Sequence, residues 1–293
     1  MTRPLIVEAM KGLGDSIYQR PFIRAAAARG PVWIETPWPE LYADLDVRFA
    51  PMHTKLRTQA LNLARQDRAR FCRAPSSARR IRLGYGRDLA TSSIVRSLEA
   101  QLPLDGAELV FDLPAELSRP WLVTSRPIAF VRPVTVRTEW RNEARNPIPV
   151  YVSQLAERLM DTHHVVSVAH VSPGAEWLAG GPIPAHLRLE HGELDVSLLI
   201  RLLSQSAVAI GGVGFLLPAA IATRTPAFIV QGGHGGHNAP ARLTDPRLDT
   251  SRIGFARPDR FCVCDKMLHR CDKKISNLDG KFTAWTRAQR IKA

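Results

Sequence analysis

Short apolar runs alternate with longer amphipathic segments along this sequence, and this alternation constrains the fold more than any other feature. Residues 4–9 are typical of a strand, residues 16–29 of a helix and residues 31–37, PVWIETP, of a second strand, with short connections between them. Strands joined through a helix are usually parallel neighbours in one sheet. The sequence therefore predicts an α/β protein.

The same alternation continues toward the C-terminus. Helices are expected at 54–73, 88–102, 149–160, 196–205 and 216–224, and strands at 81–85, 128–136, 163–171, 206–212 and 226–232. We expect a Rossmann-like domain over 1–118, a proline-containing linker over 119–127 and a second Rossmann-like domain over 128–275, with ligand sites at the carboxyl ends of the strands. A final helical segment, 276–293, is expected to pack back on the first domain.

The net charge of +13 favours an anionic partner, such as nucleic acid, a phosphorylated glycan or a membrane surface. Much of this excess lies in residues 48–87, which hold eleven Lys and Arg against one Asp. Such a run is either a solvated face or a surface for a polyanion. Aromatic residues are sparse there, so base stacking is not strongly signalled.

Three of the four cysteines fall within residues 262–271, which does not resemble a disulfide framework, and reduced thiols are expected. Cys262, Cys264, His269 and Cys271 could close a tetrahedral zinc site, although C-x-C-x4-H-x-C lacks the usual paired C-x2-C spacing. The alternative is a group of buried free thiols. Without a signal peptide or a stretch of roughly twenty apolar residues, we expect a cytoplasmic protein with no transmembrane segment.

KGLGDSIYQR, residues 11–20, places two glycines between the first strand and its helix. Gly12 and Gly14 permit positive φ and a close approach of the backbone to a ligand. Asp15 has two interpretations: it caps the helix, or it acts as a general base on a hydroxyl. The order of a Walker loop is absent, and so is the third glycine of a dinucleotide fingerprint.

This motif, with Pro21 in the next helix and a strand, glycine-rich turn and alanine-rich helix in the second half, resembles the heptosyltransferase-like enzymes of glycosyltransferase family nine. By motif the resemblance covers residues 10–22 and, more loosely, 126–141 and 193–232. It implies a GT-B fold, in which two Rossmann-like domains flank an interdomain cleft and bind acceptor and sugar nucleotide respectively. It also implies that Asp15 is the base of an inverting, metal-independent transfer, with the nucleotide sugar as co-substrate and no required cofactor.

The second half departs from this family, because Gly211 and Leu216 stand where an aspartate and a histidine are usual. The turn with Gly211, Gly212 and Gly214 precedes a helix N-terminus, which suits a diphosphate. Further donor contacts are expected from two segments that carry Arg132, Thr135, Arg137 and Arg141, and Gln231, His234 and His237. The histidines alternatively belong to a flexible surface loop.

We therefore expect a transferase that moves a sugar from a nucleotide sugar to a hydroxyl of an anionic acceptor. The acceptor is either a lipopolysaccharide-type glycan or DNA with a hydroxymethylated base, steered by Arg65, Arg68, Arg79 and Arg80. The alternative is a non-catalytic nucleic-acid-binding protein that keeps a degenerate transferase scaffold.

Overall fold

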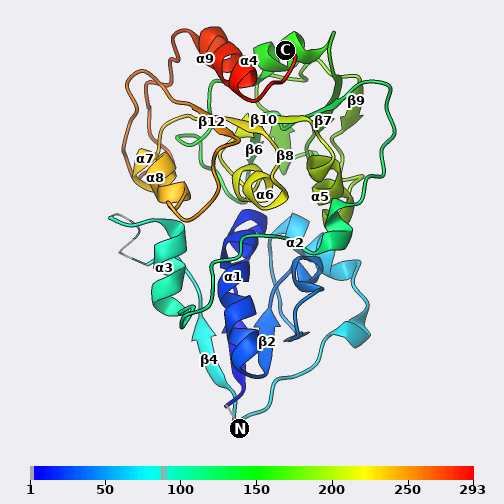
Figure 1. The fold of residues 1–293 in the computed structure, drawn as a ribbon, viewed down its shortest axis with the longest axis vertical. Helices are drawn as coiled ribbons and strands as arrows, with labels where there is room; N and C mark the ends of the chain where they lie inside the picture. Colours follow the sequence, from blue (N-terminus) through cyan, green and yellow to red (C-terminus); the bar gives the residue numbers. More distant parts are fainter. Residues whose placement is uncertain (1–2, 87–88, 90) are drawn as a thin grey trace. The chain divides into compact units, whose positions relative to one another are not determined.

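The computed structural model describes residues 3–86, 89 and 91–293, and the chain divides into two compact units (Figure 1). The first unit comprises Met1–Glu116 and Ala241–Leu248, and the second comprises Leu117–Pro240 and Asp249–Ala293. The sequence analysis expected residues 241–248 in the second domain, whereas the structure places them in the first unit.

Buried polar contacts explain why Ala241–Leu248 belongs to the first unit. The Tyr18 hydroxyl donates to the Leu243 carbonyl at 2.6 Å. Asp245, whose side chain is fully buried, accepts from Arg96 at 3.1 Å and from Arg247 at 2.9 Å. Such long-range pairs leave no periodic signal in the sequence.

A parallel sheet of four strands, in the order β3-β2-β1-β4, forms the first unit. The strands are β1 (Leu5–Glu8), β2 (Val32–Glu35), β3 (Val47–Phe49) and β4 (Arg79–Arg82). The helices are α1 (Leu13–Arg29), η1 (Pro39–Tyr42), α2 (Arg57–Ala64), η2 (Arg68–Arg70), α3 (Ile94–Gln101) and η4 (Ala115–Ser118). The residues Leu5, Ile6 and Val7 of β1 are all buried, as expected for an inner strand.

Helix α1 carries a fully buried arginine, Arg20, which the sequence analysis did not single out. Its guanidinium pairs with Asp44 at 2.5 Å and with Asp112 at 3.4 Å, and it donates to the Leu41 carbonyl at 2.6 Å. These partners compensate a charge that would otherwise be costly to bury.

The second unit contains a parallel sheet of six strands, in the order β12-β11-β10-β5-β7-β9, and an antiparallel pair, β6-β8. The strands are β5 (Ile128–Val131), β6 (Thr135–Arg137), β7 (His164–Val168), β8 (Glu176–Leu178), β9 (Leu187–Leu189), β10 (Val208–Gly212), β11 (Ala227–Val230) and β12 (Ile253–Ala256). The helices are α4 (Pro149–Leu159), α5 (Val196–Ser204), α6 (Leu216–Thr223), α7 (Gly235–Asn238) and α9 (Leu278–Ala288), while α8 (Pro240–Leu243) leads into the segment Ala241–Leu248 of the first unit.

Helix α9 packs on the second unit, whereas the sequence analysis expected it to pack back on the first domain. Phe282 is fully buried, and its ring lies 5.1 Å from that of Phe228 on β11. Trp285 contacts the same ring at 5.2 Å. Helix α9 also lies beside α4 (Figure 1). Burial of these aromatic side chains in the core of the second unit fixes the position of the helix.

Most expected elements are present, with shifted boundaries. The run 128–136 divides into β5 and β6 around Pro133, which cannot donate to a strand ladder. The helix expected at 54–73 is limited to α2. The helix expected at 88–102 begins at Ile94, because Ser93 caps its N-terminus by accepting from the Arg96 N–H, and residues 87, 88 and 90 lie outside the described part. No helix in the described part is long and apolar enough to cross a bilayer.

Replacement of Phe282 by Ala should leave a cavity between α9 and β11. We expect the free energy of unfolding of the second unit to fall by about 3–5 kcal/mol, measured by urea denaturation. Trp140→Ala is the control, because this side chain is 56% exposed and its loss should change stability by less than about 0.5 kcal/mol. Equal, small effects of the two substitutions would contradict the packing described for α9.

Candidate functional site

Both parallel sheets reverse their strand order at one point, and ligands of open α/β sheets bind outside the carboxyl ends of the strands at such a point. In the first sheet the reversal lies between β1 and β4, and in the second between β5 and β10. Asp15 lies in the first turn of the helix that follows β1. Arg132 follows β5 directly, and Gly211 and Gly212 end β10. The structure thus brings these predicted residues to the two points where a ligand is expected.

Gly12, and not Asp15, occupies the N-cap position of α1. The φ of Gly12 is −68°, so positive φ is not why glycine is needed there. A Cβ on Gly12 would lie 2.3 Å from Asp15 Oδ2, so any other residue there would displace the carboxylate. The other carboxylate oxygen, Oδ1, accepts a hydrogen bond from the Tyr85 hydroxyl. Glycine at position 12 therefore allows the Asp15 carboxylate to keep this position.

The loop before Asp15 is fixed by side chains that bind its main chain. The Met10 N–H donates to Gln19 Oε1 at 3.0 Å, and Gln19 Nε2 donates to the Met10 carbonyl at 3.1 Å. The Lys11 carbonyl accepts from Trp38 Nε1 and from Gln59 Nε2, both at 2.8 Å. These hydrogen bonds fix the main chain of the loop, which is the condition for preorganised chemistry.

Two buried tyrosines lie close enough to Asp15 for its negative charge to affect their pKa. Burial raises the pKa of Tyr18 and of Tyr42 well above the usual range, and the negative charge of Asp15 adds to both shifts. The two hydroxyls stay protonated and donate to main-chain carbonyls, Tyr18 to Leu243 at 2.6 Å and Tyr42 to Ser16 at 2.7 Å. Both tyrosines therefore have a structural role, because each hydroxyl ties helix α1 or η1 to a main-chain carbonyl of another segment.

Arg132 is the cation at the reversal point of the second sheet. Its N–H donates to the Ile210 carbonyl on β10 at 2.8 Å, and its guanidinium lies 4.9 Å from the centre of the Phe215 ring. Burial, and then the positive charge of Arg137, lower the pKa of Arg132 to about 10, so the guanidinium stays charged at neutral pH. Arg132 forms no ion pair with a carboxylate of the described residues. A partly buried cation in this situation favours an anionic ligand.

The other residues predicted near Arg132 are engaged with protein groups. Arg137, on β6, pairs with the buried carboxylate of Glu176 at 3.0 Å. The carbonyl of Thr135 accepts from Asn146 at 2.9 Å. Arg141 is exposed and pairs with Glu143 at 2.5 Å. Glu176 was not singled out in the sequence, because its burial depends on the β6-β8 pairing.

The glycine-rich turn after β10 is shaped by close packing. A Cβ on Gly211 would lie 2.9 Å from Leu216 Cδ2 and 3.1 Å from the Arg132 Cβ, and Leu216 is fully buried. A Cβ on Gly214 would meet no atom within 4 Å. Gly211 and Leu216, at positions where the resemblance to family nine implies polar residues, lie in apolar packing beside Arg132.

Gln231 and His234 lie in the loop after β11 and are both buried. Gln231 Nε2 donates to the Asn238 carbonyl at 2.6 Å. Amides of Asn142 and Asn238 donate to His234 Nδ1 at 3.2 and 2.9 Å, and Nε2 donates to the Asp265 carbonyl at 3.1 Å. Burial lowers the pKa of His234, consistent with this neutral form. The ring connects three loops.

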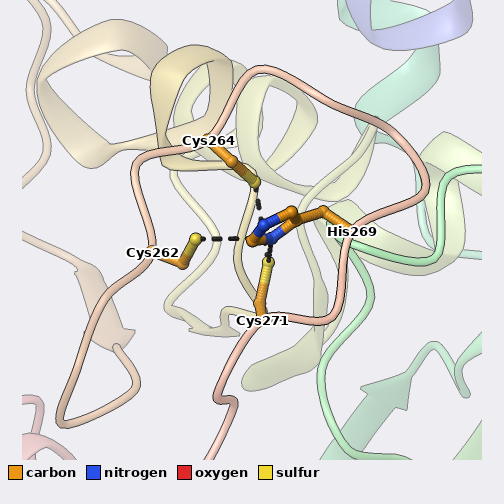
Figure 2. A group of neighbouring side chains, drawn as sticks. All are labelled: Cys262, Cys264, His269 and Cys271. Atoms are coloured by element: carbon orange, nitrogen blue, oxygen red, sulfur yellow. Dashed lines mark hydrogen bonds between the residues drawn. The ribbon is translucent and has the colours of Figure 1, made fainter.

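Cys262, Cys264, His269 and Cys271 converge, as Figure 2 shows, with one ligand atom of each within 4.8 Å of the others. The sulfurs of Cys264 and Cys271 are 3.6 Å apart, and His269 Nδ1 lies 3.6 Å from the Cys262 sulfur and 3.3 Å from that of Cys271. Tetrahedral zinc with bonds of about 2.0–2.3 Å separates its ligands by about 3.5–3.8 Å. The four residues therefore fit a closed tetrahedral metal site.

The loop that carries this cluster binds the loop with Gln231 and His234, a contact that the sequence analysis missed. Gly235 and Gly236 donate through their N–H groups to the carbonyls of Cys262 and Cys264, at 2.8 and 3.1 Å. A Cβ on Gly233 would lie 2.1 Å from the Cys271 sulfur. The closely spaced glycines of QGGHGGHN could have indicated this contact in the sequence, because glycines allow another backbone to approach closely.

The four arginines predicted to steer an acceptor are all exposed but fall into two groups. Arg65 and Arg68 follow α2, ahead of Phe71, which bridges to Phe49 on β3. Arg79 and Arg80 lie on β4, at the opposite edge of the sheet, where Arg80 pairs with Glu35 at 2.8 Å. The single basic patch suggested by the sequence is thus divided by the width of the sheet.

These features define an α/β protein of two parallel-sheet units with polar residues at both reversal points. No protein-family model matches the chain, and no curated protein matches its sequence. TibC, an iron-containing dodecameric glycosyltransferase from enterotoxigenic E. coli H10407, superposes with a TM-score of 0.65 at 16% identity, over 98% of this chain and 76% of TibC. The E. coli ADP-heptose lipopolysaccharide heptosyltransferase II superposes with a TM-score of 0.59 at 13% identity, over 99% of this chain and 100% of that enzyme. The chain has the GT-B fold of the heptosyltransferases, as its opening motif predicted.

Gly211→Ala and Gly214→Ala test whether the turn after β10 is close-packed. A Cβ at position 211 must displace Leu216 or Arg132, and we expect a loss of about 1–3 kcal/mol, whereas Gly214→Ala should change stability little. Differential scanning fluorimetry measures both variants. A melting temperature for Gly211→Ala equal to that of Gly214→Ala would contradict the described contact.

Proposed function

We propose that this protein is a glycosyltransferase that moves a sugar from a nucleotide-sugar donor to a hydroxyl of an anionic acceptor, with inversion. The observation that carries the proposal is the placement of Asp15. Its carboxylate stands at the reversal point of the first sheet, behind a fixed loop and within hydrogen-bond reach of a hydroxyl group, that of Tyr85. The fold shared with heptosyltransferases supports the same class of reaction.

In this proposal Asp15 is the general base. It takes the proton of the acceptor hydroxyl while the acceptor oxygen bonds to the anomeric carbon of the sugar. The bond from that carbon to the diphosphate breaks at the same time, and the nucleoside diphosphate leaves with the electron pair. Attack opposite the leaving group inverts the anomeric carbon. Cationic and amide groups of the protein, without a catalytic metal, stabilise the departing charge.

The second unit is proposed to bind the donor. Arg132, whose charge no carboxylate of the described residues pairs, and the turn Gly211–Gly214 before α6 would hold the diphosphate. The buried Oε1 of Gln231 has no hydrogen-bond partner among the described residues and offers an acceptor for a donor hydroxyl. TibC has been solved with ADP-D-beta-D-heptose, so ADP-heptose is the first donor to test.

The acceptor is proposed to be polyanionic, because exposed arginines dominate residues 65–82 of the first unit. A phosphorylated lipopolysaccharide-type glycan and DNA with a hydroxymethylated base both offer a hydroxyl beside phosphates. Arg65, Arg68, Arg79 and Arg80 would contact those phosphates, which position the acceptor.

A second candidate is a nucleic-acid-binding protein without transferase activity. It is favoured by the apolar contact of Gly211 with the fully buried Leu216, which occupies positions where polar residues are usual in family nine. Such a protein would bind polyanions and no sugar nucleotide.

Asp15→Asn is expected to lower sugar transfer at least 100-fold and to leave donor binding unchanged, because the amide cannot accept the proton. Thermal shift with a panel of sugar nucleotides, beginning with ADP-heptose, measures binding, and release of nucleoside diphosphate measures turnover. Each donor is tested with phosphorylated glycan, with hydroxymethylated DNA and with plain DNA at fixed salt.

Asp46→Asn, which changes an exposed aspartate of the same unit, is the control and should keep wild-type turnover. Full turnover by Asp15→Asn would exclude Asp15 as the base. A thermal shift with DNA alone, and with no sugar nucleotide, would favour the nucleic-acid-binding candidate.

We also propose that Cys262, Cys264, His269 and Cys271 hold a structural zinc ion. Because all four positions of a tetrahedron are then taken by the protein, no position stays open for a substrate. One equivalent of zinc per chain is expected by elemental analysis. Chelation or Cys264→Ser should lower the melting temperature by several degrees. Cys72→Ser, at an exposed cysteine outside the cluster, should not. An unchanged melting temperature after chelation would contradict the site.

A further inference from the structure

We infer that Tyr85 is a positioning residue for the Asp15 carboxylate, through the hydrogen bond that its hydroxyl donates to Oδ1. This inference rests on the proposed function, since it gives Tyr85 a role in setting the geometry of the proposed base.

The sheet brings Tyr85 to Asp15 across the reversal point. Strands β1 and β4 are parallel neighbours, and Glu8 lies opposite Arg82 at their carboxyl ends. The Leu83 N–H donates to the Glu8 carbonyl at 3.0 Å, which extends the pairing beyond β4. The segments that follow the two strands therefore start side by side, one leading to Asp15 and the other to Tyr85.

Helix α3 holds the backbone on both sides of Tyr85. The side-chain amide of Gln101 accepts from the Gly84 N–H at 3.0 Å and donates to the Gly84 carbonyl at 2.7 Å. The Gly86 N–H donates to the Ser97 hydroxyl at 3.4 Å. Because the flanking residues are bound on both sides, the phenol is presented from a defined position.

The Asp15 carboxylate is held on one side and has room on the other. Oδ1 accepts the hydrogen bond from Tyr85, and Oδ2 lies in the space that a Cβ on Gly12 would occupy. The hydrogen bond from Tyr85 therefore favours one conformation of the Asp15 side chain. An oxygen with two lone pairs can still accept the proton of an acceptor hydroxyl. A base fixed in this way loses less entropy in the reaction.

Tyr85 differs from the two other tyrosines near Asp15. Tyr18 and Tyr42 are buried, and their hydroxyls donate to main-chain carbonyls. The Tyr85 side chain is 48% exposed, so its ring can also contact an arriving acceptor. A residue that served only stability would gain little at such an exposed position.

Tyr85→Phe is expected to lower kcat about ten-fold or more, while the thermal shift and KM for the donor remain at wild-type values. In the Asp15→Asn background it should have no further effect, because the base it positions is gone. Gln101→Met, which releases Gly84, should lower kcat in the same direction. Tyr151→Phe is the matched control: the Tyr151 hydroxyl accepts from the Ile275 N–H in the second unit, and kcat should be unchanged.

Wild-type kcat in Tyr85→Phe would overturn the inference and leave the proposed function intact. An equal loss of kcat in Tyr85→Phe and Tyr151→Phe would also overturn it, because the effect would then be one of stability. If the wild-type protein transferred no sugar from any donor of the panel, the proposed function itself would fail, and the role of Tyr85 with it.

Discussion

Parallel strands place all their carboxyl ends at one edge of a sheet, and a reversal of strand order separates the connections there. Each sheet of this protein has one such reversal, between β1 and β4 and between β5 and β10. The residues that follow these four strands are Asp15, Tyr85, Arg132 and the Gly211–Gly214 turn. The chemistry proposed for the chain thus depends on strand order more than on any local motif. In the proposed function, the base belongs to the first sheet and the cation for the leaving group to the second.

Glycines at these points are needed because they lack a side chain, which leaves room for neighbouring groups, and not because of unusual backbone angles. Gly12 leaves room for the Asp15 carboxylate, Gly211 for Leu216 and Arg132, and Gly233 for the Cys271 sulfur. None of the three has a positive φ. Each glycine therefore marks a position where a side chain approaches the backbone. The sequence alone does not identify which side chain that is. The same property explains how the cysteine-bearing loop can lie against the loop of His234.

The sequence predicted the strands and helices well where an apolar run was bounded by turn residues, as in β1, α1, β10 and α4. It predicted that Asp15 and the turn at Gly211 follow strands, and so where each would lie. It could not predict the hydrogen bond of Tyr85 to Asp15, because the two residues are 70 positions apart and meet only through the pairing of β4 with β1. The sequence did not predict the unit to which Ala241–Leu248 and α9 belong, for a similar reason. Their placements depend on the burial of Asp245 and of Phe282 against residues far away in the chain.

The division of the basic residues bears on the nature of the acceptor. Arg68 lies near β3, and Arg79 lies on β4, with β2 and β1 between these strands. Three strand spacings amount to about 14 Å. A small hydroxyl compound can reach one of these groups but not both. A chain of phosphates or phosphorylated sugars can extend across the whole width, and each phosphate it brings would gain from a separate cation. If both groups take part, the acceptor is an extended polyanion.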